Sequence, residues 1–170
     1  MTRGASVVRR ATLDDAPAIG DIHVRSWQAA YAGVVPAAVL EGLSPDRRAA
    51  YWAQELEGGA VVWVVEHERA VAGFAAVGPA RDADLPPDSG EVHAIYLAPE
   101  AWDRGLGRAL FAAAVEGLRA SVTGLLVLWV LADNLRGRRF YEAAGWMPDG
   151  EARPIDIGGS AIEELRYRAG

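Results

Sequence analysis

The sequence predicts a mixed α/β fold, built as a single domain over residues 1–170. Three observations support this prediction. The chain is 51% hydrophobic, which is enough for one buried core, and its length of 170 residues is typical of one domain. β-rich runs separated by short turns follow a helical first third. In the second half, helical and β-rich segments alternate, which is typical of mixed α/β organisation.

The first third of the chain contains a strand and two helices. Residues 6–9 form a short β-rich run. An acidic pair followed by Pro17 marks the start of a helix that extends to about Tyr31, because carboxylates satisfy free amides in a first turn and proline has no amide to satisfy. A Ser-Pro pair at 44–45 starts a second helix, which ends near residue 57 before two glycines. One stripe of the first helix carries Ile19, His23, Trp27 and Tyr31.

Three β-rich runs come next, and the short segments between them predict an antiparallel meander. The runs are 61–66, 70–78 and 91–98. The clearest loop, at 81–88, separates the second run from the third and has the sequence RDADLPPD.

The last third predicts a helix at 106–119, a strand at 125–131, a helix at 134–144 and a final strand at 162–167. The run at 125–131, LLVLWVL, shows no alternation of apolar and polar residues. This is expected for a strand that helices cover on both faces.

Composition and charge exclude several classes of function. The formal net charge is −6, which argues against a nucleic-acid partner and favours a cationic small molecule. The chain has no cysteine, which excludes disulfides, thiolate zinc sites and cysteine nucleophiles, and we expect no metal. No apolar run approaches the roughly 20 residues that span a bilayer, so we expect no membrane partner and a cytoplasmic location.

The segment between the strand at 91–98 and the helix at 106–119 contains two glycines, Gly105 and Gly107. A glycine turn at a helix start forms an anion site, because its amides point outward, the helix dipole adds positive potential and no Cβ blocks a pyrophosphate. The simpler alternative is a glycine-rich turn that leads into a packed helix. A Rossmann motif is excluded by Leu110, where that motif has glycine, and the Gly-Lys-Ser/Thr of a P-loop is absent.

This segment resembles the acyl-CoA pyrophosphate loop of the Gcn5-related N-acetyltransferase (GNAT) superfamily. The family pattern is Arg/Gln-x-x-Gly-x-Gly/Ala, and Gly105 and Gly107 occupy its two small-residue positions. Trp102 stands at the first position in place of Arg or Gln, while Arg104 and Arg108 flank the turn and can compensate.

A second segment, 132–146, is similar to the family's strand-Asn, helix-Phe-Tyr-x-x-x-Gly-Phe/Trp signature. Within it, Asn134 as an N-cap and Gly145 as a helix stop are explained by helix chemistry alone. The order of elements also follows the family over nearly the whole chain. The resemblance therefore implies the GNAT fold, with a mixed, mostly antiparallel central sheet of about six to seven strands, flanked by four helices and splayed between strands 4 and 5.

The resemblance also implies acetyl-CoA (coenzyme A) as the cofactor, with its pantetheine arm paired to the main chain of strand 4. The acyl chain length remains open, because the depth of the gap between the splayed strands sets it. The implied contacts are Ile95, Tyr96, Leu97, Arg104, Gly105, Leu106, Gly107, Arg108, Ala109, Asn134 and Tyr141.

The implied reaction is transfer of an acetyl group to a primary amine by direct attack in a ternary complex, which requires a base to remove a proton from the ammonium. Glu91 is the first candidate, because it has the register of the family's glutamate base relative to the glycine loop. His93, on the same strand face by alternation, is the second. In the family, a tyrosine at the position of Tyr141 protonates the departing thiolate. The alternatives are a solvated Glu91, a structural His93 and a core Tyr141.

The residues that bind the acceptor amine have the weakest signal in the sequence. Trp27, Gln28 and Tyr31 occupy the region that covers the substrate in similar proteins, and aromatic walls near carboxylates would suit a cationic amine. Alternatively, Trp27 and Tyr31 are only the buried stripe of a helix. The acceptor is a small-molecule or peptide amine: a polyamine, amino acid, aminoglycoside, lysine or protein N-terminus. The main alternative function is a non-catalytic acyl-CoA-binding or regulatory module of the same fold. A homodimer is a further expectation, based only on the resemblance to the family.

Overall fold

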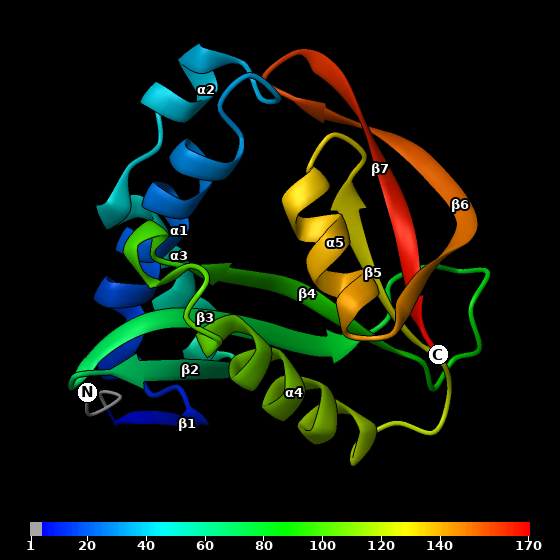
Figure 1. The fold of residues 1–170 in the computed structure, drawn as a ribbon, viewed down its shortest axis with the longest axis horizontal. Coiled ribbons are helices and arrows are strands. Elements are labelled where there is room, and N and C mark those ends of the chain that lie inside the picture. The colour runs from blue at the N-terminus through cyan, green and yellow to red at the C-terminus, as the bar shows by residue number, and fades with distance from the viewer. Residues whose placement is uncertain (1–4) are drawn as a thin grey trace.

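The computed structural model describes residues 5–170, which form a seven-stranded sheet with helices on both faces (Figure 1). The order of strands across the sheet is β1-β2-β3-β4-β5-β7-β6. Neighbouring strands are antiparallel except β4 and β5, which are parallel. The strands are β1 (Ser6–Arg10), β2 (Val61–His67), β3 (Ala70–Pro79), β4 (Gly90–Leu97), β5 (Leu126–Leu131), β6 (Trp146–Ile157) and β7 (Ser160–Ala169).

The four predicted helices are present as α1, α3, α4 and α5, and a short fifth helix, α2, was not predicted. Helix α2 has five residues, of which only Leu40 is buried, so its sequence carries no amphipathic repeat. None of the helices in the described part of the chain is long and apolar enough to cross a bilayer. The helices are α1 (Ala16–Ala30), α2 (Ala37–Glu41), α3 (Pro45–Glu57), α4 (Leu106–Arg119) and α5 (Leu135–Ala143).

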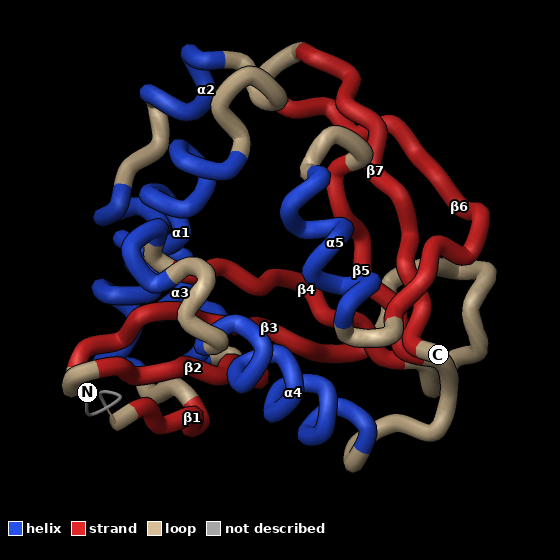
Figure 2. The backbone as a smooth tube through the Cα atoms, viewed as in Figure 1, coloured by secondary structure: helices blue, strands red, loops and turns tan. Residues whose placement is uncertain are grey.

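Strand β6 was also missed by the sequence reasoning, which expected only one strand after α5. It forms a long antiparallel hairpin with β7, turning at Gly158 and Gly159 (Figure 2). Most of its side chains are exposed, and it contains Pro148 and Pro154, so it shows no continuous apolar pattern. Proline is tolerated there because β6 is the edge strand of the sheet.

Strands β4 and β5 separate soon after they meet. Their pairing covers three residue pairs, from Gly90–Leu126 to Val92–Leu128. Beyond Val92, β4 continues to Leu97 paired with β3 alone, so its main chain is unpaired on the side that faces β5. Figure 1 shows the two strands running in clearly different directions. The predicted splay between strands 4 and 5 is confirmed.

A β-bulge in β4 determines which of its side chains share a face. The pairing of β3 with β4 shifts by one residue, which leaves His93 as the extra residue of the bulge. Glu91 and His93 still lie close together, with the carboxylate 3.9 Å from the imidazole Nε2. Beyond the bulge the alternation is reversed, and Tyr96 stacks on His23 of α1.

Two layers of helices cover the half of the sheet that contains β1 to β4. Helix α4 packs on one face of β2, β3 and β4, and α1 with α3 covers the other face. The main core includes Phe74 of β3 and Leu110 of α4 and extends to Tyr167 of β7. A smaller apolar cluster joins α1 and α2 to the β5–β7 half and includes Tyr31, Val35 and Leu131. The gap between the two halves is therefore bounded by packed structure on several sides.

Candidate functional site

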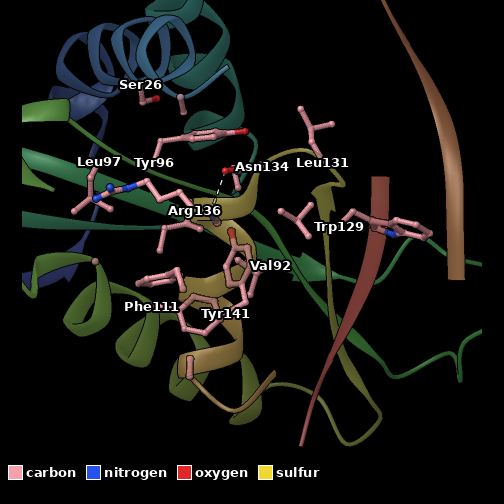
Figure 3. A pocket seen from close by; sticks show the side chains of 18 of the residues that line it. Ser26, Val92, Tyr96, Leu97, Phe111, Trp129, Leu131, Asn134, Arg136 and Tyr141 are labelled. Atoms are coloured by element: carbon pink, nitrogen blue, oxygen red, sulfur yellow. Dashed lines mark hydrogen bonds between the residues drawn. The ribbon is translucent and has the colours of Figure 1, made fainter. Parts of the chain in front are cut away.

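A cavity of about 1090 Å³ lies where β4 and β5 diverge (Figure 3). Its walls come from α1, β4, α4, β5, α5, β6 and β7, and thus from both halves of the sheet. One end lies at the start of α4 and along α5, and the other lies between α1 and the β6–β7 hairpin. We call these the glycine-loop end and the hairpin end.

The glycine turn at the start of α4 has the conformation that an anion site needs. Gly105 is the N-cap of α4 and has φ of +80°, a left-handed value that glycine adopts without strain. A Cβ on Gly107 would lie 3.3 Å from the Phe140 ring and 3.4 Å from Leu97, so a side chain there would crowd the wall of the cavity. The amides that precede the first intrahelical bond of α4 are free to meet an anion.

Trp102 and Arg136 form a contact across the glycine-loop end. The Trp102 indole donates a hydrogen bond to the carbonyl oxygen of Leu97 (3.1 Å). The Arg136 guanidinium, from the first turn of α5, lies 4.6 Å from the centre of the indole ring and forms an ion pair with Asp103 (2.9 Å). Arg136 therefore places a cation beside the glycine loop, where Trp102 occupies the first position of the family pattern in place of Arg or Gln.

Helix α5 contributes Asn134 and Tyr141 to the cavity. The Asn134 side chain accepts a hydrogen bond from the Gly137 amide (3.0 Å), which confirms its role as the N-cap. The Tyr141 ring packs against Phe111 and Phe140, and its hydroxyl points into the cavity (Figure 3). Burial, together with the nearby Tyr96 phenol, raises the pKa of Tyr141 well above its usual value, so the phenol keeps its proton.

Glu91 and His93 reach the cavity from β4. Glu91 is buried. Its carboxylate accepts a hydrogen bond from the main-chain amide of Arg81 (3.2 Å) and another from Nη2 of the Arg81 guanidinium (2.5 Å). The pairing with Glu91 raises the pKa of Arg81. The His93 side chain is partly exposed, and its Nε2 lies 3.0 Å from the carbonyl oxygen of Pro79. Because a carbonyl only accepts, Nε2 carries the hydrogen and Nδ1 keeps its lone pair.

The model of the acetyltransferase (GNAT) family matches residues 19–146 of this sequence. The chain belongs to the GNAT family. It is therefore an acetyltransferase, and the predicted fold and family are confirmed.

Relatives agree with this assignment over nearly the full chain. The uncharacterized N-acetyltransferase YuaI of Bacillus subtilis is 34% identical over 161 residues, which cover 93% of this chain and 89% of YuaI. The ribosomal-protein-alanine N-acetyltransferase of Brucella melitensis is 25% identical, with a TM-score of 0.74 over 95% of this chain and 98% of the relative. The yncA protein of Salmonella typhimurium, solved with acetyl-CoA, shares the fold at 22% identity with a TM-score of 0.73, over 96% and 92% of the two chains.

Within this GNAT domain, the structure brings most of the predicted site residues to one cavity. Trp27, Tyr31, Glu91 and His93 line its walls with Ile95, Tyr96, Leu97, Gly105, Gly107, Arg108, Asn134 and Tyr141. Four predicted residues lie elsewhere. Arg104, Leu106 and Ala109 are absent from the walls described, with Leu106 packed in the core. Gln28 donates to the carbonyl oxygen of Leu40 (3.0 Å) and lines a smaller cavity beside α2.

Several wall residues of the GNAT domain were missed by the sequence reasoning. Arg136 lies at the glycine-loop end, and Trp129, Arg153 and Glu164 lie at the hairpin end. The strand at 125–131 reads as uniformly apolar, which gave no sign that Trp129 faces a cavity. Arg153 and Glu164 belong to the β6–β7 hairpin, whose first strand was not predicted. For Arg136, its place two residues after the Asn134 N-cap was the one available signal.

Proposed function

We propose that this GNAT protein transfers the acetyl group of acetyl-CoA to a primary amine by direct attack in a ternary complex. One observation carries the proposal: a proton donor, Tyr141, and a proton acceptor, His93, face one cavity from α5 and β4, on either side of the gap. The glycine turn and the unpaired edge of β4 complete the arrangement that such a reaction needs.

Acetyl-CoA fits the glycine-loop end. The free amides of α4, together with Arg108 and Arg136, would bind its phosphates, and the main chain of Ile95 to Leu97 would pair with its pantetheine arm. When bound, it supplies a thioester whose carbonyl carbon accepts the amine. The structures of yncA with acetyl-CoA and of the Thermoplasma acidophilum paia N-acetyltransferase with coenzyme A support this assignment.

His93 takes the proton of the attacking amine at Nδ1, because Nε2 is engaged with the Pro79 carbonyl. Glu91 is a positioning residue in this proposal, since its carboxylate is held by Arg81 and stabilises the imidazolium from 3.9 Å. Tyr141 supplies a proton from its phenol to the leaving sulfur. Its raised pKa keeps that proton in place until the sulfur becomes basic.

The proposal is tested by comparing Tyr141→Phe with the wild-type protein. Acetyl-CoA at about 100 times its dissociation constant adds roughly 2.7 kcal/mol to the free energy of unfolding, and both proteins should show this shift. Thiol release with an amine panel should fall about 10²- to 10⁴-fold in the variant, because the general acid is lost. Among residues 5–170, burial and the nearby Tyr96 perturb the Tyr141 hydroxyl and no hydrogen bond holds it, so the variant should fold normally.

Two outcomes would contradict this function. A wild-type protein that acetyl-CoA stabilises, but that releases no thiol with any amine, would be a binding module. A protein that acetyl-CoA does not stabilise at millimolar concentration would lack the cofactor site itself.

A further inference from the structure

The charges at the hairpin end of the cavity indicate what kind of amine this end accepts. Among residues 5–170, six arginines and three carboxylates line the whole cavity, although the chain carries a net charge of −6. Four of the arginines and Asp103 lie on α4, α5 and the loop before α4, at the end assigned to the cofactor. The hairpin end holds Arg81, Arg153, Glu91 and Glu164, whose formal charges sum to zero.

Both carboxylates at the hairpin end are buried and already paired. The Glu91 side chain is 2% exposed and lies 2.5 Å from Nη2 of Arg81. The Glu164 side chain is 11% exposed and lies 2.6 Å from Nε of Arg153. A cationic ligand group would have to compete with an arginine for either carboxylate. The end therefore offers no free carboxylate to a second ammonium group.

The two arginines, in contrast, are accessible. The side chains of Arg81 and Arg153 are 65% and 42% exposed. Nη1 of Arg81 and Nη2 of Arg153 have no hydrogen-bond partner in the described part of the chain. Each guanidinium can thus donate to an incoming anion while it keeps its carboxylate partner.

The position of Arg153 is set by several neighbours. Its guanidinium lies 3.9 Å from the centre of the Trp129 ring, and its Nη1 also bonds Asp82 (3.2 Å). A cation held in this way loses little side-chain entropy when it binds a ligand. Arg153 therefore has the properties of a preformed anion contact, reached from the same cavity as His93.

We propose that the acceptor is an amine that also carries a carboxylate, namely a free amino acid. This inference rests on the proposed function and names its substrate class. The carboxylate binds Arg81 and Arg153, and the apolar side chain lies toward Trp27, Tyr31 and Ile155. Polyamines, aminoglycosides and protein N-termini lack such a carboxylate beside the amine, so they leave Nη1 of Arg81 and Nη2 of Arg153 without an acceptor.

The transfer step balances with the groups present. A bond forms between the amine nitrogen and the acetyl carbonyl carbon, and the bond from that carbon to sulfur breaks. The nitrogen loses a proton to His93 and the sulfur gains one from Tyr141. The products are an N-acetyl amino acid, which keeps its carboxylate, and free coenzyme A.

The test compares amino acids with their own carboxamides, which keep the amine and the side chain but lose the negative charge. We expect kcat/KM to be about 10- to 100-fold higher for the preferred amino acid than for its carboxamide. Arg153→Gln should reduce this ratio severalfold, with Arg81 retaining the rest, mainly by raising KM for the amino acid, and should leave KM for acetyl-CoA unchanged. Arg153→Lys should restore part of the ratio. Arg168→Gln removes an exposed arginine of β7 outside the cavity and should leave the ratio unchanged.

A second readout needs no turnover. The binding of an N-acetyl amino acid and of its carboxamide, measured by calorimetry with coenzyme A present, should show the same preference for the free carboxylate. Equal binding of the two, or faster acetylation of a polyamine than of any amino acid, would overturn the inference while leaving acetyl transfer intact. A carboxylate preference in binding without thiol release would instead contradict the proposed activity and support the anion site.

Discussion

His23 is a buried histidine whose environment favours its neutral form. Its Nδ1 accepts a hydrogen bond from the Trp52 indole (3.0 Å), and its ring stacks on Tyr96 at a centroid distance of 5.2 Å. Burial, with a smaller contribution from Arg48, lowers the pKa of His23 to about 4. Tyr96 packs against the hydrophobic core and also lines the cavity, so His23 lies directly behind a wall residue of the cavity.

This histidine should make stability depend on pH in a defined window. The unfolded chain binds the His23 proton below pH 6.5, but the folded protein binds it only near pH 4. Protonation therefore favours unfolding, and stability is lost as the pH falls from 6.5 to 4, at up to about 1.4 kcal/mol per pH unit.

The measurement is urea unfolding at several pH values for the wild-type protein and for His23→Asn, whose amide oxygen can still accept from Trp52. The variant should lose less stability across this window. Identical slopes in the two proteins would show that His23 does not carry the effect.

At the scale of elements, the loop before α4 and the start of α5 are in contact through Trp102 and Arg136. In the family pattern, a side chain of the loop itself supplies the charge, whereas in this chain the indole supports a guanidinium that comes from the next helix. The ion pair with Asp103 joins the same two elements. Arg136 is therefore held beside the glycine turn, where its guanidinium can meet a pyrophosphate.

We expect Arg136→Ala to raise KM for acetyl-CoA about tenfold with little change in kcat, because a charge-assisted phosphate contact is lost. With S-acetylpantetheine, which lacks the pyrophosphate, the variant and the wild-type protein should behave alike. Arg47→Ala, an exposed arginine on α3, provides the control. An equal loss with both donors would indicate that Arg136 supports the fold and does not contact phosphate.

At the scale of the whole molecule, the two halves of the sheet are joined by more than the short β4–β5 pairing. Arg166 of β7 is 6% exposed and binds Asp149 (2.7 Å), Asp84 (2.8 Å) and Asp82 (3.3 Å). Asp82 also accepts a hydrogen bond from the Trp129 indole (2.9 Å). The loop between β3 and β4 is thereby attached to β5, β6 and β7, which holds Arg81 at the hairpin end of the cavity.

Arg166→Met should therefore destabilise the protein by about 3 kcal/mol, because it leaves the carboxylates of Asp82 and Asp149, each only 10% exposed, without their shared cation. Arg25→Met is the matched control, since Arg25 also binds two carboxylates but is 40% exposed, and it should cost less than about 1 kcal/mol. Urea unfolding of both variants measures the difference. Comparable losses would mean that burial of Arg166 contributes little to its effect.

The sequence by itself determined the features that depend on near neighbours. The capping of α5 by Asn134, the glycine turn before α4 and the apolar run of β5 are set within a few residues, and each was predicted in place. The family patterns in two short segments were enough to predict the splayed sheet and to name twelve residues that line one cavity. Strand β6 was missed because an exposed edge strand with two prolines carries no regular apolar pattern.

Only the tertiary structure decided how the site is charged and which face its residues share. The bulge at His93 depends on how β3 pairs with β4, and alternation along one strand does not reveal it. The sequence analysis expected aromatic walls near carboxylates, and only the structure shows that Glu91 and Glu164 are paired with arginines. Arg153 and Asp82 meet across 71 positions of the chain. Contacts of this kind arise only when distant strands pack together, so they cannot be predicted from local propensity or periodicity.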